Sequence, residues 1–309
     1  MDMTDRYRLM RLSRRFEETV HEQFEAGMVP GPLHLSIGQE AVAVGACSEL
    51  RLTDAVVSTH RGHHHCLAKG AAPDRLMAEL LGRRSGYSHG RGGSMHIAVP
   101  EIGLIGTNGI VGGGLPIATG AAYGIQTMGR DDVAVCFFGE GAAGNGVLAE
   151  ALNVAALWDL PLVFVAENNQ YVELTPVAIH VAGEIWRRGE AYGIPGVRVD
   201  GNDVDAVARA ADEAIARARS GVGPTLIEAV TYRWFGHYAG DKAAYRDSEE
   251  VARWRERDPI VRARALLDGA IADPLDADVE REIGAALEFA LESEVSGTDV
   301  LAIDHYAAA

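Results

Sequence analysis

The chain has 309 residues, of which 48% are hydrophobic and 23% are charged, and its formal net charge is −16. This composition is ordinary for a globular protein, and such an acidic surface disfavours binding to nucleic acid or to an anionic membrane. No run of 18 apolar residues predicts a membrane span, and the N-terminus lacks an apolar signal core. Three scattered cysteines indicate reduced thiols, so we expect a cytoplasmic protein.

The first half of the chain predicts helices separated by a glycine-rich stretch. A first helix is expected to begin at an N-cap, Thr4, and to run to Glu25, because apolar residues recur at every fourth position from Leu12 to Phe24. We expect further helices at residues 39–50, 73–82 and 116–128. The glycine-rich segment 83–115 is expected to be irregular.

The second half alternates between strands and helices. We expect strands at four apolar runs, residues 133–138, 162–166, 197–199 and 224–230. One helix is expected between the first two strands and another at residues 203–219. A mainly helical C-terminal extension is expected over about 243–309, and in it Ser248 is expected to cap a helix that begins at 249. The alternation predicts a single α/β domain over residues 1–309, with a mostly parallel sheet covered by helices on both faces.

Polar residues follow two neighbouring predicted strands. Gly139-Glu140-Gly141 comes directly after the strand 133–138, and Glu167-Asn168-Asn169 comes after the strand 162–166. Ligands of open α/β sheets bind at the carboxyl ends of the strands. The sequence therefore predicts a binding site here, in a strand–helix–strand unit.

Two ligands fit this unit. One is a dinucleotide, because Gly139, Gly141 and Gly144 spell GxGxxG and Glu167 could hold a ribose, although it follows the last glycine by 23 residues instead of the usual ~20. The other is a diphosphate carried on Mg²⁺. Glu140 and Asn169 would then supply side-chain oxygens and Tyr171 a backbone carbonyl, since Mg²⁺ prefers oxygen ligands. The N–H groups of Gly141 and Ala142, at a helix start, would face the phosphates.

The sequence of this unit resembles the thiamine diphosphate motif, normally written GDG with a pair of asparagines about thirty residues later. The resemblance extends over most of the chain. It includes HLSIGQEAVAVG (34–45), HRGH (60–63), MAELLGRRSGYSHGRGGSMH (77–96), NGIVGGGLPIATGAA (108–122), IPGVRVDGND (194–203), TYRWFGHYAGD (231–241) and YRDSEEV (245–251). Together these segments resemble the alpha subunits of thiamine diphosphate-dependent 2-oxo acid dehydrogenases, and their local sequence is most similar to the acetoin type.

The resemblance implies roles for residues outside the strand–helix–strand unit. His60 and Arg61 would hold the diphosphate from a second direction, and His237 would lie near the diphosphate and the substrate entrance. His34 would face the reacting part of the cofactor as an acid or base, and His63 would line the channel. The backbone of three further residues would embrace the aminopyrimidine ring, namely Gly109, Ile110 and Val111.

The resemblance also implies partners and a reaction. The expected cofactors are thiamine diphosphate and Mg²⁺, and the expected partner is a beta subunit in an α2β2 heterotetramer, without which the chain should be inactive. The reaction would be decarboxylation of a 2-oxo acid or cleavage of acetoin, with transfer of the acyl fragment to a lipoyl acyltransferase. A carboligase subunit without a lipoyl partner and a non-catalytic scaffold remain alternatives. The family normally has Asp where Glu140 stands.

Two other patterns have competing interpretations. His60, His63 and His64 have i, i+3, i+4 spacing, which is compatible with a zinc site, although no nearby Cys or acidic residue completes the ligand set. Gly120 and Gly124 place two positions without side chains on one helix face. That face fits either packing within the chain or contact with another subunit, and the resemblance favours the subunit contact.

Overall fold

The computed structural model describes residues 1–302 and contains a six-stranded parallel sheet in the order β2-β1-β3-β4-β8-β7. The two central strands, β3 (Ala134–Gly139) and β4 (Leu162–Asn168), follow the predicted apolar runs and pair in parallel, with Gly139 opposite Glu167. β8 (Thr225–Val230) and β7 (Gly196–Asp200) extend the sheet on one side. The predicted α/β class with a mostly parallel sheet is confirmed.

Two short strands on the other side were not predicted. β1 (Ala55–Val57) pairs with β3, and β2 (Leu104–Gly106) pairs with β1 at the sheet edge. β2 lies within the segment 83–115 that was expected to be irregular. This segment also contains two 3₁₀ turns, η1 (Gly93–Met95) and η2 (Pro100–Ile102), and the first residues of α5. Strands of three residues are too short to show a hydrophobic period.

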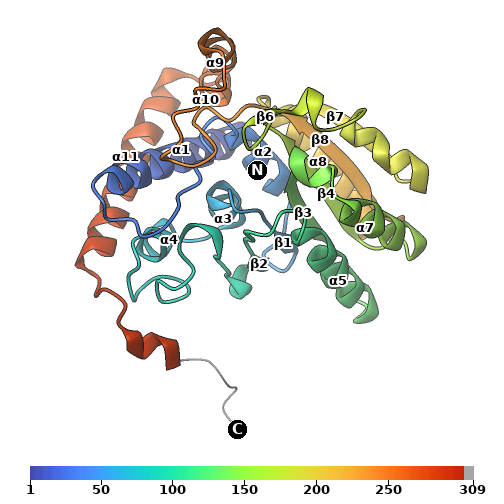
Figure 1. The fold of residues 1–309 in the computed structure, drawn as a ribbon, viewed down its shortest axis with the longest axis horizontal. Coiled ribbons are helices and arrows are strands. Elements are labelled where there is room, and N and C mark those ends of the chain that lie inside the picture. Colours follow the sequence, from blue (N-terminus) through green and yellow to red (C-terminus); the bar gives the residue numbers. More distant parts are fainter. Residues whose placement is uncertain (303–309) are drawn as a thin grey trace.

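Helices cover both faces of the sheet (Figure 1). One face carries α5 (Gly114–Thr127), α7 (Gly146–Leu157) and η4 (Ile185–Tyr192). The opposite face carries α8 (Val204–Arg219), with α2 (Glu40–Cys47) packed on it. Alternate residues of β3 divide between the two cores, since Val135 and Phe137 join one while Cys136 and Phe138 join the other. This is the period-2 alternation of a strand that is buried on both faces.

The two ends of the described chain pack together. α1 (Met3–Glu25), blue in Figure 1, lies beside the red α11 (Gly269–Glu292), which also contacts α4 (Pro73–Leu80). α3 (His63–Lys69) is buried between α1 and α2. The C-terminal extension is largely helical as far as it is described, and its last predicted residues, 303–309, lie outside the described part. It comprises α9 (Ser248–Arg255), α10 (Pro259–Arg264), α11 and η5 (Thr298–Ala302).

Two predicted helix caps were wrong by one or two residues. The N-cap of α1 is Asp2, whose carboxylate accepts from the Asp5 backbone N–H, and Thr4 lies inside the helix. The N-cap of α9 is Asp247, which accepts from the backbone N–H of Glu249, so Ser248 is the first helical residue. In both cases an adjacent aspartate takes the capping role, for which it is at least as suitable. No helix in residues 1–302 is long and apolar enough to cross a bilayer.

Candidate functional site

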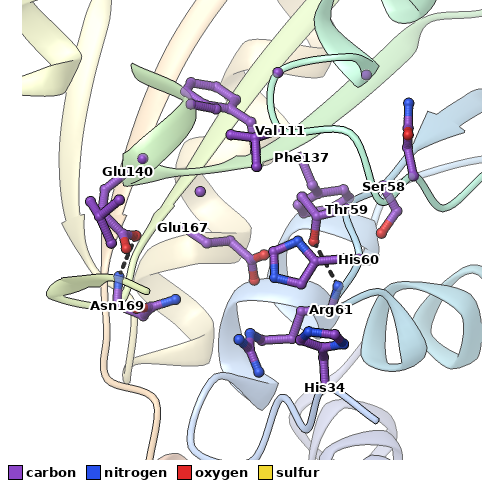
Figure 2. Close-up of a pocket in the computed structure, with 18 of the residues that line it drawn as sticks. His34, Ser58, Thr59, His60, Arg61, Val111, Phe137, Glu140, Glu167 and Asn169 are labelled. Carbon is purple, nitrogen blue, oxygen red and sulfur yellow. Dashed lines mark hydrogen bonds between the residues drawn. The ribbon is translucent and has the colours of Figure 1, made fainter. Parts of the chain in front are cut away.

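A cavity of about 250 Å³ opens at the carboxyl ends of β1, β3 and β4. Its lining includes the two predicted polar segments, which meet because β3 and β4 are neighbours in register. β3 leads into the four-residue helix α6 (Glu140–Ala143), and β4 leads into a small hairpin of β5 (Tyr171–Val172) and β6 (Thr175–Pro176). Figure 2 shows Glu140 and Asn169 on one side of this cavity and His34, His60 and Arg61 on the other.

Two oxygen atoms and one side-chain amide converge at the junction of α6 and the hairpin. The Asn169 amide lies 3.3 Å from Glu140 Oε1 and 3.2 Å from the Tyr171 carbonyl oxygen, and with its nitrogen turned toward them it donates to both. With its oxygen turned toward them instead, its Nδ2 group donates to Gln39 Oε1 at 3.2 Å, and a bound cation would favour this second orientation. The backbone N–H of Asn169 donates to Glu140 Oε2 at 3.1 Å. Oxygens held this close repel one another unless a proton or a cation lies between them.

Burial leaves the Glu140 carboxylate in an unfavourable environment. Glu140 is 2% exposed, and no salt bridge to it is found within residues 1–302. Removal from water is the main cause that raises the pKa of Glu140 to about 7, while hydrogen bonds from its own and the Asn169 backbone N–H groups lower it in part. A bound cation would relieve this cost directly. The described residues therefore fit a divalent, oxygen-preferring ion.

The turn after β3 leaves its backbone accessible to the cavity. Gly139 is the N-cap of α6 and offers no side-chain hydrogen bond, so no side chain caps the N–H groups of the first turn. Glycine is required at position 141, because a Cβ there would lie 2.9 Å from Val172 Cγ1. Gly141 and Ala142 both line the cavity. The site thus combines a carboxylate with the anion-binding start of a short helix.

Two buried arginines supply positive charge on the opposite wall. Arg61 donates to the carbonyls of Leu35 at 2.5 Å and of His237 at 2.9 Å, so part of its guanidinium already holds the scaffold. Burial, followed by the nearby charge of Arg233, lowers the pKa of Arg61 to about 9. Burial likewise lowers the pKa of Arg233. Another arginine, Arg91, lies outside this wall and donates to the carbonyls of Ser88 and Val300.

Three histidines complete this wall. His34, His60 and His237 all line the cavity, and their ring centroids lie 4.9 to 5.5 Å apart. Burial, followed by the charge of Arg61, lowers the pKa of His34 to about 3, that of His60 to about 2 and that of His237 to about 4. All three rings are therefore uncharged near neutral pH, in the form that accepts a proton or binds a metal.

The structure does not bring every predicted residue into the cavity. His63, expected to line the channel, is fully buried; its Nδ1 lies 3.0 Å from Glu17 Oε1 and its Nε2 lies 3.0 Å from Ser94 Oγ. His64 Nε2 lies 3.7 Å from the same glutamate, so the alternative of a zinc cluster of His60, His63 and His64 is not supported. Both side chains belong to α3, which faces α1 instead of the cavity.

The segment 109–111 lies at the rim of the cavity. Ile110 and Val111 are 73% and 58% exposed, although both line the opening together with Gly109. Sequence reasoning missed several other lining residues, including Ser58, Met95 and Asn108. They belong to loops whose path depends on the short strands β1 and β2. Only their position beside the quoted motifs could have suggested them.

Glu167 lines the cavity but has a partner in the interior of the protein. It is 6% exposed, and its Oε1 lies 3.3 Å from His65 Nε2. His65 in turn bonds Ser58 Oγ through Nδ1 at 2.8 Å and stacks on Phe137. The ion-pair geometry of Glu167 with His65 gives the dinucleotide interpretation of GxGxxG no further support.

Residues 8–298 match the family model described as dehydrogenase E1 component. The chain is 48% identical over 288 residues to the alpha subunit of acetoin:2,6-dichlorophenolindophenol oxidoreductase of Bacillus subtilis, covering 92% of this chain and 86% of that protein. It is 42% identical to the protein of the same name from Cupriavidus necator, covering 93% and 87%. It is 46% identical to the pyruvate dehydrogenase E1 component subunit alpha of Rhizobium meliloti, covering 84% and 76%.

These similarities extend over nearly the whole chain and include both strand ends that form the cavity. They confirm the resemblance drawn from the sequence segments, and they confirm the predicted enzyme class, an oxidoreductase component. The chain belongs to the dehydrogenase E1 component family.

Proposed function

We propose that this chain is the alpha subunit of a thiamine diphosphate- and Mg²⁺-dependent dehydrogenase that acts on acetoin or a 2-oxo acid. The family implies thiamine diphosphate. The observation that carries the proposal is the convergence of Glu140 Oε1, the Tyr171 carbonyl oxygen and the Asn169 side-chain amide, whose oxygen would turn toward a bound cation. Adjacent ligands of an octahedral Mg²⁺ with bonds of about 2.1 Å lie about 3.0 Å apart, close to the 3.2 and 3.3 Å separations here.

The longer side chain of Glu140 supports this assignment as well as an aspartate would. Its Oε1 reaches Asn169 Oδ1 while Oε2 still accepts the Asn169 backbone N–H, so the extra methylene is accommodated without loss of that contact. The N–H groups of Gly141 and Ala142 would meet the diphosphate. His60, Arg61 and His237 would hold it from the opposite wall. Gly109 and the neighbouring rim residues would contact the aminopyrimidine ring.

Thiamine diphosphate supplies a carbanion equivalent that attacks carbonyl groups. The part of this chain is to bind the cofactor, to exclude water and to handle protons. His34 is a candidate for hydrogen bonding to the substrate, because its ring lines the cavity and its Nδ1 is buried without a partner among the described residues. His237 shares this wall and would assist at the substrate entrance. His63, being engaged by Glu17 and Ser94, would position the loop that carries Met95.

A partner subunit is supported by apolar surface next to the cavity. Ile110 and Val111 are exposed at the rim, and Ile117 and Tyr123 on α5 are 44% and 49% exposed. A Cβ on Gly120 or Gly124 of the same helix would meet nothing within 4 Å, so this face is open to close approach by a helix of another chain. We infer that a beta subunit covers this surface, that the assembly is an α2β2 heterotetramer, and that the chain alone does not turn over.

The acceptor distinguishes the remaining alternatives. We propose a lipoyl group on an acyltransferase as the physiological acceptor, whereas a carboligase would release an acyloin without it. Two of the relatives are named for oxidation of acetoin with a dye as acceptor, which supports acetoin as the first substrate to test. With the beta subunit present, reduction of lipoamide would support the dehydrogenase, and release of an acyloin alone would support the carboligase.

Calorimetry tests the cofactor assignment before any assay of turnover. Thiamine diphosphate should bind the chain with its beta subunit only when Mg²⁺ is present, and Glu140→Gln should abolish this binding. Glu190→Gln, an exposed change on η4, is the matched control and should leave binding unchanged. Binding of NADH in place of thiamine diphosphate, or equal binding by Glu140→Gln, would overturn the proposal. No binding by the native complex would favour the non-catalytic scaffold.

A further inference from the structure

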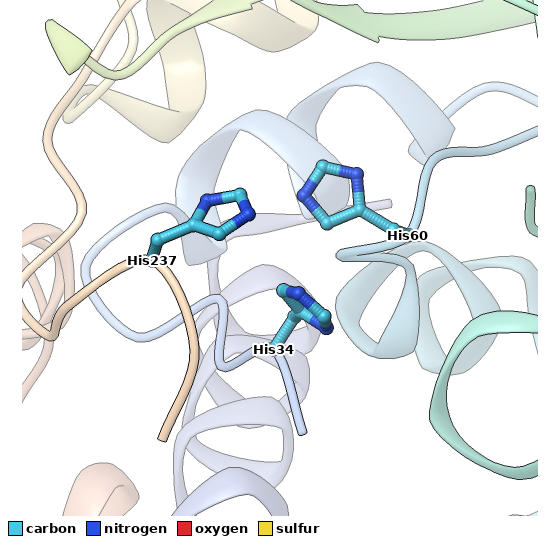
Figure 3. A group of neighbouring side chains, drawn as sticks. All are labelled: His34, His60 and His237. Carbon is cyan, nitrogen blue, oxygen red and sulfur yellow. The ribbon is translucent and has the colours of Figure 1, made fainter. Parts of the chain in front are cut away.

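Three histidine rings from distant parts of the chain face one another in the cavity wall (Figure 3). His34 follows α1, His60 follows β1, and His237 follows β8. Each offers one ring nitrogen, and these three nitrogens all lie within 4.8 Å of one another. The residues that hold Mg²⁺ in the proposed function are oxygen donors, whereas this cluster is built of nitrogen donors alone.

We propose that His34, His60 and His237 form a second metal site, selective for a transition-metal ion of the zinc class. Neutral imidazole is a preferred ligand of Zn²⁺, Co²⁺ and Cu²⁺ but a poor ligand of Mg²⁺. Three protein ligands with a fourth position open to a cavity is the arrangement of exchangeable and catalytic zinc sites. The fourth ligand here would be water from the cavity.

The geometry requires only small movements. An ion at the centre of a triangle with sides of 4.8 Å lies about 2.8 Å from each nitrogen, roughly 0.7 Å beyond the zinc–nitrogen bond length. Rotation of the rings about χ2, a torsion with broad minima, can supply a shift of this size.

The ring nitrogens are available for a metal. His34 Nδ1 is buried and has no hydrogen-bond partner among residues 1–302. His60 makes ring contacts with the other two histidines. His237 Nδ1 lies 3.4 Å from Arg233 Nη1, at the outer limit of a hydrogen bond. Arg233 can give up this contact, because it also donates to the Phe235 and Glu173 carbonyls and to the Tyr245 hydroxyl.

Charges around the cluster set the strength of binding. Arg61 and Arg233 oppose a dication, while Glu140, Glu167 and Asp241 favour one. None of these carboxylates is a hydrogen-bond partner of the three rings, so the supporting bonds typical of permanent zinc sites are missing among the described residues. The ion should therefore bind weakly enough to be removed by a chelator.

This site has a consequence for turnover that rests on the proposed function. An ion held by His34 and His237 would occupy the wall where the substrate is expected and would remove both rings from proton transfer. Zinc ions should then inhibit the assembled enzyme reversibly. Because His60 and His237 are also proposed to hold the diphosphate, an excess of thiamine diphosphate should weaken this inhibition.

Cobalt(II) titration of the purified full-length chain tests the site itself. Co²⁺ in a tetrahedral nitrogen-rich site absorbs visible light far more strongly than octahedral Co²⁺ at an oxygen site. We expect strong absorption for the native chain and for Glu140→Gln. Each of His34→Asn, His60→Asn and His237→Asn should weaken Co²⁺ binding by at least about tenfold. His89→Asn is the matched control, because His89 lies outside the cavity lining and asparagine tolerates its left-handed backbone, φ 55°.

A second measurement needs no variant. Crystals of the native chain exposed to Zn²⁺ should show anomalous scattering from an ion between the three rings. Weak Co²⁺ absorption in the native chain, equal absorption in the histidine variants and the control, or zinc located only at Glu140 and Asn169 would each overturn the proposal. The cobalt and zinc measurements do not involve thiamine diphosphate, so failure of the proposed function would leave their outcome unaffected.

Discussion

We predict that the buried Glu140 carboxylate, proposed as a ligand of Mg²⁺, destabilises the folded protein when no metal is bound. The pKa of its carboxyl is raised from an ordinary value of 4.5 to about 7, chiefly by burial. The folded state therefore retains a proton that the unfolded state releases between these two pH values. This group's contribution to stability falls as pH rises through that window, by about 3 kcal/mol at most.

The substitution Glu140→Gln removes the buried charge while keeping the shape of the side chain. One amide atom can still accept from the Asn169 backbone N–H, as Oε2 does at 3.1 Å, and the other can donate to Asn169 Oδ1, which lies 3.3 Å from Oε1. We expect the metal-free variant to be more stable than the native chain by about 1–3 kcal/mol at pH 8 and to differ little at pH 4.5.

Urea denaturation at several pH values, with and without Mg²⁺ and thiamine diphosphate, measures this difference. At a hundred times their dissociation constant, the ligands should raise the free energy of unfolding of the native protein by about 2.7 kcal/mol. They should not change the stability of Glu140→Gln. The stability advantage of the variant should therefore become smaller or reverse. The exposed control Glu190→Gln should match the native chain within about 0.5 kcal/mol. A metal-free Glu140→Gln that is less stable than the native chain at pH 8 would refute the reasoning.

Three further substitutions test the scaffold. Arg14→Met leaves the buried Glu40 carboxylate without its arginine and should lower the free energy of unfolding by about 3–5 kcal/mol. In a double-mutant cycle, adding Glu40→Gln should recover part of this loss. Glu79→Gln should lower the free energy of unfolding by about 2–4 kcal/mol, because four backbone N–H groups of the loop 88–93 donate to the Glu79 carboxylate. An unchanged midpoint of urea denaturation would contradict this prediction. Gly120→Leu should fold normally but fail to bind the beta subunit in gel filtration, whereas Gly284→Leu, also at an open helical position, should bind it.

The sequence predicts the central part of the fold well because its signals are local and long. The runs that became β3, β4 and β8 are six or seven residues each and are buried throughout or nearly so. Their polar ends meet because parallel neighbours align at the same edge, which is a rule of topology that needs no knowledge of side-chain contacts. The oxygen cluster of Glu140 and Asn169 follows from that rule.

The edge of the sheet and the loops could not be predicted in the same way. β1 and β2 have three residues each and exist because β3 offers a strand to pair with. Their position then fixes the loops that carry Ser58 and Asn108 into the cavity. Such residues depend on tertiary contacts and leave no periodic pattern in the sequence.

The histidines show most clearly how far the site can be predicted from sequence spacing alone. Spacing of i, i+3, i+4 brings side chains together only within one helix, but α3 begins at His63, so His60 lies in the preceding turn and points elsewhere. His63 and His64 turn inward to Glu17, where a buried carboxylate requires polar partners. The rings that do meet belong to residues 26 and 177 positions apart, at the ends of different elements. His60 and His237 come from the same convergence of strand ends that creates the oxygen-donor set, and the loop after α1 adds His34. The fold therefore places oxygen donors and nitrogen donors on opposite walls of one cavity, and we expect each to select its own class of metal ion.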